Sequence, residues 1–175
     1  MSFPEPVISQ AIEPKTKADL DKLKRLLDNK VVPKPIDARD TIRLEAENFH
    51  SLDHYVLDYR NDRALSKRIC VLPDASGRGR IETPFLEPYT APRARYEVEV
   101  RYNSDAAGKC EFALSVNGKQ AGEPWRAAGG EAGWRSHTIP DVTIDSGDMI
   151  AIEMRGGDGE VGGLDYVELR AVDSL

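Results

Sequence analysis

Apolar and polar side chains alternate strictly in the segment RYEVEVRY, residues 95–102. The apolar members occupy every second position: Tyr96, Val98, Val100 and Tyr102. Because successive side chains of a β-strand point to opposite faces of a sheet, this period of two predicts a strand with one buried face. An amphipathic helix needs a period near 3.6, so the pattern excludes a helix here.

The same alternation recurs in CEFALSVNG, residues 110–118, and in DMIAIEMR, residues 148–155. Turn signals separate these segments: the hairpin dipeptide Asn117-Gly118, Gly147, and a glycine-rich run at 156–159. Strands that recur about every ten residues with no helix between them are typical of an antiparallel β-sandwich or jelly roll. The sequence therefore predicts an all-β fold.

The N-terminal part has a different pattern. In ADLDKLKRLLDN, residues 18–29, the leucines have helical spacing, which predicts a short amphipathic helix. The following segment, KVVPKPIDARD at 30–40, contains two prolines that exclude helix and favour an extended linker. We therefore expect an N-terminal strand and helix arm with its linker over 1–40, and one sandwich domain over 41–175.

Composition narrows the choice of partner. The chain has 40% hydrophobic residues and a net charge of -6. Nucleic-acid binding rests on Lys and Arg that neutralise phosphates, so the negative charge argues against it. No run of about 20 apolar residues is present, so we expect no membrane span.

The two cysteines, Cys70 and Cys110, lie in apolar strand-like segments. Two buried thiols are the favoured interpretation, and a single disulfide between them stays open. The first residues lack the basic and apolar stretches of a signal peptide. This leaves a cytosolic protein or a domain of a longer exported protein, and we favour a secreted or extracellular parent.

Three motifs occur in order: IRLEAENF at 42–49, NGKQAGEPW through GWRSHTI within 117–139, and GGLDYVELR at 162–170. Together they resemble families 6 and 35 of the carbohydrate-binding modules over nearly all of residues 41–172. The resemblance implies a galactose-binding-like jelly roll. It also implies a non-catalytic module that binds a polysaccharide or oligosaccharide and accompanies the catalytic domain of a glycoside hydrolase or polysaccharide lyase.

In those families, acids of the first and last strands hold a structural calcium ion, and the matching residues are Glu45, Glu47 and Asp165. Glu45 and Glu47 are two apart on an expected strand, hence about 7 Å apart on one face. The alternative is that they are solvated carboxylates of an edge strand, paired with Arg43.

Family 6 modules bind sugar at the loop ends of the sandwich, where an aromatic ring stacks on the pyranose. We expect the loops at 54–67, 122–135 and 155–163 to line such a cleft. Seven ligand-binding candidates lie in them: Tyr59, Asn61, Arg63, Trp125, Trp134, Asp158 and Glu160. Trp125 is expected to favour ligand contact, whereas core burial and ligand contact are equally open for Trp134.

One position departs from the family pattern. The Asn that hydrogen-bonds the sugar, two positions before the Asp of the last strand, is replaced by Gly163. Asp158, Glu160 or Arg155 could serve a different ligand. A structural spacer or protein-interaction sandwich that has lost sugar binding is the alternative function.

Residues 3–23, FPEPVISQAIEPKTKADLDKL, resemble the start of the third domain of elongation factor G. The chain has no phosphate-binding G-x-x-x-x-G-K-[ST] loop, so we assign no GTPase function.

We also expect no catalytic activity. The acidic residues mostly alternate outward on strands instead of facing one another in a cleft, as glycoside hydrolysis requires. The three histidines, His50, His54 and His137, belong to no metal-binding motif.

Overall fold

The computed structural model describes residues 41–59, 69–86, 94–104, 108–127, 129–130, 132–156 and 162–174. The chain divides into two units, Met1–Val32 and Pro33–Leu175. The helix and linker predicted within 1–40, and the segment that resembles elongation factor G, lie outside the described residues.

The described residues form eleven strands and one 3-10 helix. In chain order they are β1 (Thr41–Glu45), η2 (Ala46–Asn48), β2 (Ser51–Asp53), β3 (Tyr55–Asp58), β4 (Cys70–Pro73), β5 (Arg78–Pro84), β6 (Ala94–Ser104), β7 (Glu111–Val116), β8 (Lys119–Arg126), β9 (Gly133–Ile144), β10 (Met149–Arg155) and β11 (Leu164–Ser174).

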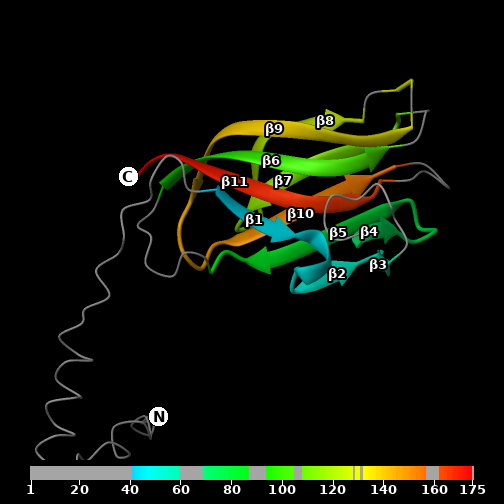
Figure 1. The fold of residues 1–175 in the computed structure, drawn as a ribbon, viewed down its shortest axis with the longest axis horizontal. Helices are drawn as coiled ribbons and strands as arrows, with labels where there is room; N and C mark the ends of the chain where they lie inside the picture. The colour runs from blue at the N-terminus through cyan, green and yellow to red at the C-terminus, as the bar shows by residue number, and fades with distance from the viewer. Residues whose placement is uncertain are drawn as a thin grey trace, which may run out of the picture. The chain divides into compact units, whose positions relative to one another are not determined.

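These strands build two antiparallel sheets. One has the order β3-β4-β11-β6-β9, with β1 also paired to β11, and the other has the order β2-β5-β10-β7-β8. Figure 1 shows the long strands β6, β9 and β11 of the first sheet running alongside β10, β7 and β5 of the second. The predicted all-β, antiparallel sandwich is confirmed.

The core lies between the sheets and follows the alternation in the sequence. On β6, Tyr96, Val98 and Val100 are fully buried, while the charged residues between them are partly exposed. On β10, Ile150 and Ile152 are fully buried in the same way. Burying each such side chain stabilises the fold by roughly 1.5–3 kcal/mol.

The hairpin between β7 and β8 has the predicted turn. Asn117 and Gly118 both have positive φ, 52° and 74°, as a two-residue type I′ loop requires. The Asn117 Nδ2 group donates to Asp148 Oδ1 at 2.7 Å, and its Oδ1 accepts from the Met149 backbone N–H at 2.8 Å. The turn is thereby tied to the start of β10.

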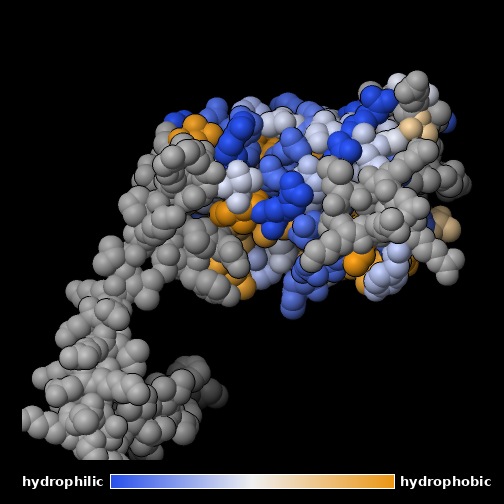
Figure 2. Space-filling model, in the orientation of Figure 1, coloured by the Kyte–Doolittle hydropathy of each residue, from blue (hydrophilic) through white to orange (hydrophobic). Residues whose placement is uncertain are grey.

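Cys70 and Cys110 are both buried and neither forms a disulfide, as favoured from the sequence. Within the described ranges, no helix has the length and apolar character needed to cross a membrane. On the face seen in Figure 2, hydrophilic residues cover most of the described surface, and hydrophobic areas are small and separate.

Candidate functional site

The outer face of the five-stranded sheet carries a group of charged side chains that alternate with core residues. On β5, Arg80 and Glu82 flank the fully buried Ile81, and on β10, Glu153 and Arg155 flank the buried Met154. Because the strands are paired in register, with Glu153 opposite Arg80, these side chains lie next to one another on one surface.

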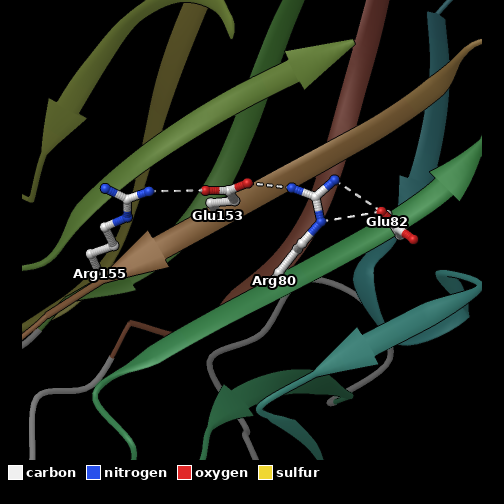
Figure 3. Close-up of polar contacts among 4 residues, drawn as sticks. All are labelled: Arg80, Glu82, Glu153 and Arg155. Carbon is white, nitrogen blue, oxygen red and sulfur yellow. Dashed lines mark hydrogen bonds and ion pairs between the residues drawn. The ribbon is translucent and has the colours of Figure 1, made fainter. Parts of the chain in front are cut away.

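Ion pairs connect them in a row, which Figure 3 shows across β5 and β10. Arg80 donates to Glu82 Oε2 from Nε at 3.1 Å and from Nη2 at 2.9 Å. Its Nη1 group donates to Glu153 Oε1, and Arg155 Nη2 lies 3.5 Å from Glu153 Oε2. Arg80 is therefore held by two carboxylates, while Arg155 is only loosely engaged.

Two hollows adjoin this row. The first, of about 220 Å³, lies over β7 and β8 and includes Ser115, Gln120 and Pro124 in its lining. The Ser115 Oγ atom is buried and has no hydrogen-bond partner. The second, of about 620 Å³, lies over β2, β5 and β10. Glu153 and Arg155 line both hollows, so the two form neighbouring parts of one surface.

The second hollow is bordered by an ordered acid and histidine pair. His54 Nδ1 lies 2.9 Å from Asp74 Oδ2, and the Ser76 backbone N–H donates to Asp74 Oδ1 at 2.8 Å. Hydrogen bonds from Ser76 and His54 lower the pKa of Asp74 to about 2. Asp74 is therefore charged at neutral pH, and His54 donates to it from Nδ1.

Three of the seven residues predicted to line a loop-end cleft lie among the described residues: Tyr59, Trp125 and Trp134. Tyr59 is described and its residue surface is 65% exposed, whereas Trp134 lies in β9 and is half-buried. Four other candidates lie outside the described residues: Asn61, Arg63, Asp158 and Glu160. The predicted loops are also shorter, because β3 occupies Tyr55–Asp58 and β8 continues to Arg126.

Trp125, expected to contact ligand, is a core residue. It is only 6% exposed and its indole stacks between Phe112, at 5.6 Å between ring centroids, and His137, at 4.5 Å. Both faces of the ring are occupied, so it offers no platform for a sugar. The reason is that β8 is an edge strand whose inward positions close the side of the sandwich next to β9.

Gly163 lies in a crowded position where the family pattern has an asparagine. A Cβ atom at this position would lie 2.7 Å from Leu72 Cδ2 and 3.2 Å from the Val71 carbonyl oxygen. The first distance is well inside van der Waals contact, and the second atom belongs to the backbone of the neighbouring strand. Packing between β4 and the start of β11 therefore leaves little room here, and a larger side chain would require Leu72 and the β4 backbone to shift.

The three carboxylates of the predicted calcium site lie near the junction of β1, η2 and β11. Glu45 is paired in register with Tyr166, the neighbour of Asp165, and a β-bulge shifts the register between Leu164 and Tyr166. Asp165 is fully buried, and Glu45 Oε2 is buried with no hydrogen-bond partner. In the described part of the chain, no three His, Cys, Asp or Glu side chains already form a cluster able to hold a metal ion.

The charged row was missed from the sequence, except for Arg155. Its signal is present in RGRIE at 78–82 and AIEMR at 151–155, where charged residues occupy alternate positions of apolar strands. The cross-strand register, which brings residues 73 positions apart into contact, is not visible there.

Solved structures with similar folds include carbohydrate-binding modules. A family 35 module from Clostridium thermocellum matches with a TM-score of 0.59 at 16% identity, over 74% of this chain and 97% of the module. The chain has a family 6/35-type carbohydrate-binding-module fold. The C-terminal family 6 module of a marine laminarinase from Zobellia galactanivorans matches with a TM-score of 0.56 at 15% identity, over 75% of this chain and 99% of the module.

The same module fold occurs within a larger enzyme. A Podospora anserina β-(1,4)-mannanase with a family 35 module matches with a TM-score of 0.58 at 15% identity, over 77% of this chain and 28% of the enzyme. This chain therefore spans less than a third of that protein. No family model and no curated protein matches the sequence.

Replacing Trp125 with alanine is expected to lower the free energy of unfolding by about 3–5 kcal/mol, the usual cost of emptying a buried aromatic site. Chemical denaturation measures this directly. The exposed Tyr59→Ala variant is the control, and it should stay within about 0.5 kcal/mol of the parent protein. A stable Trp125→Ala protein would mean that the indole is not part of the core.

Proposed function

We propose that the sandwich is a non-catalytic module that holds a polysaccharide chain on the outer face of its five-stranded sheet. One observation carries this proposal: two hollows meet at Glu153 and Arg155 and together cross the sheet from β2 to β8. A groove that crosses several strands suits an extended chain better than a single small molecule. The module fold of the similar solved structures supports the same ligand class.

The side chains of this face suit the hydroxyl groups of sugars. Glu153 and Arg80 present planar arrays of acceptors and donors, and Ser115 and Gln120 add a hydroxyl and an amide. The buried Ser115 Oγ has no protein partner, so a ligand hydroxyl would satisfy it. Recognition on this face rests on hydrogen bonds, since the exposed Tyr59 follows β3 in the other sheet.

The arrangement supports binding rather than hydrolysis. Glycoside hydrolysis uses two carboxyl groups that face each other across the scissile bond. Glu82 and Glu153 instead share the guanidinium of Arg80 on an open sheet surface. A binding module of this kind raises the local concentration of an attached hydrolase or lyase on its polysaccharide.

A second candidate function is a spacer or protein-interaction domain. The edge strand β3 favours it, because Val56 and Leu57 are exposed there. An exposed apolar edge is a common site of strand pairing with another chain. Binding to a protein partner without retention on any glycan would support this function over the first.

Glu153→Ala is expected to weaken retention on the bound polysaccharide about tenfold, because a charged hydrogen-bonding group is lost where the hollows meet. Affinity electrophoresis measures the change, after a glycan array has identified the polysaccharide. Glu168→Ala is the matched control, since Glu168 also pairs with an arginine, Arg43 at 2.7 Å, on the outer face of the other sheet. Unchanged retention of Glu153→Ala, or no retained glycan at all, would contradict the proposal.

We also infer a structural calcium site at Glu45, Glu47 and Asp165. A buried carboxylate oxygen without a hydrogen-bond partner, as in Glu45, is costly unless a cation or a proton compensates it. The β-bulge beside Asp165 supports this inference, since bulges redirect side chains. Since the described side chains form no ready cluster, backbone carbonyls and water would complete the six to eight oxygen ligands that calcium takes.

Calcium at about 100 times its dissociation constant is expected to stabilise the folded state by about 2.7 kcal/mol, because the ion binds only that state. Adding a chelator should therefore lower the melting temperature, and Glu45→Gln should remove the response to calcium. Glu168→Gln, on the same sheet, should keep the response. Equal melting temperatures with calcium and with chelator would contradict the proposed calcium site.

A further inference from the structure

Two arginines lie directly opposite each other on the outer face of the five-stranded sheet. Arg78 of β5 is the register partner of Arg155 of β10, and both line the hollow of about 620 Å³. Side chains that are direct partners across antiparallel strands lie about 5 Å apart at Cβ, and like charges in such pairs destabilise the sheet. A neighbouring or bound anion would therefore stabilise this pair.

The carboxylates of Glu82 and Glu153 pair mainly with Arg80. Arg80 forms ion pairs with Glu82 Oε2 and with one carboxylate oxygen of Glu153. Arg155 reaches the other oxygen of Glu153 only at 3.5 Å, and its side chain is 78% exposed. Arg155 thus keeps most of its donors open to a ligand.

Arg78 has a histidine as its neighbour in place of an acid. Its Nη2 group lies 3.4 Å from His54 Nε2. His54 Nδ1 donates to Asp74, and its Nε2 atom faces Arg78, so this contact orients the guanidinium without neutralising it. Among the described residues, no carboxylate lies within ion-pair distance of Arg78.

The hollow is locally positive on a negative protein. Three arginines line it, Arg78, Arg80 and Arg155, against two acids, Asp53 and Glu153, whereas the whole chain has a net charge of -6. The Asp53 carboxylate lies 3.9 Å from His54 Nε2. An anionic ligand group would therefore find net attraction from the residues that line this hollow.

We propose that Arg78 and Arg155 bind the carboxylate or sulfate group of an anionic saccharide. The proposal rests on the proposed function and adds the ligand class. Guanidinium groups match both anions because their paired N–H donors meet two oxygens at once. Glu153 and Ser115, beyond Arg155, then contact hydroxyls of the neighbouring sugar units.

The test compares polymers that differ only in charge. The full chain is titrated with polygalacturonate and its fully methyl-esterified form, and with a sulfated galactan and its desulfated form. The acidic member of at least one pair is expected to bind about tenfold more tightly, a gain that weakens as salt is raised. The pair that responds identifies the anion as carboxylate or sulfate.

Arg78→Gln and Arg155→Gln should each remove about tenfold of the affinity for the acidic polymer and leave the neutral counterpart unaffected. Arg126→Gln is the matched control: its side chain is 76% exposed and pairs with Glu111 on the same sheet, outside the hollow. Thermal melts check folding, and the Arg78 and Arg155 variants should melt at or above the parent temperature because a like-charge pair is relieved.

Each outcome bears on a different claim. Equal binding of acidic and neutral polymers would overturn the anionic ligand class while leaving polysaccharide binding intact. In a second outcome, the parent protein prefers the acidic polymer while Arg78→Gln and Arg155→Gln reduce that preference no more than Arg126→Gln does. This result would overturn the assignment of the anion site to this hollow. Failure to bind any glycan would overturn this inference together with the proposed function.

Discussion

Strand β10 fixes both the core and the candidate binding surface, because a strand that buries one set of side chains must present the other set. Ile150, Ile152 and Met154 are buried between the sheets, and Glu153 and Arg155 therefore face outward. Pairing with β5 on one side and β7 on the other then places the two hollows beside these charges. A shift of one residue in either register would turn the charges into the core, so the surface is as firmly specified as the fold.

The features that could be predicted from the sequence are those that depend on residues close together along the chain. The alternation in β6 and the Asn117-Gly118 turn depend on neighbouring residues alone, and both were predicted correctly. The burial of Trp125 depends on His137 of β9, which no local pattern contains. The like-charge pair of Arg78 and Arg155 likewise exists only through strand register. Fold class was therefore predictable, whereas the surface that carries the candidate site was not.

The comparison with solved modules shows that the fold persists at low sequence identity. At 15% to 16% identity the sandwich is retained, because many combinations of apolar residues fill such a core. The loop-end position at Gly163 is crowded by Leu72 and by the backbone of β4, and Trp125 is packed inside. These two facts favour a ligand on the outer face of the five-stranded sheet over one at the loop end, since the Ser115 hydroxyl on that face lacks a partner.

The location of the ligand is tested most directly by nuclear magnetic resonance. An oligosaccharide of the recognised polymer is titrated into the ¹⁵N-labelled chain, and backbone shifts are followed residue by residue. The account predicts that the largest changes fall on β5, β7 and β10, around Arg78, Ser115 and Glu153. Changes confined to the surroundings of Tyr59, Trp134 and Gly163 would contradict it and return the site to the loop end.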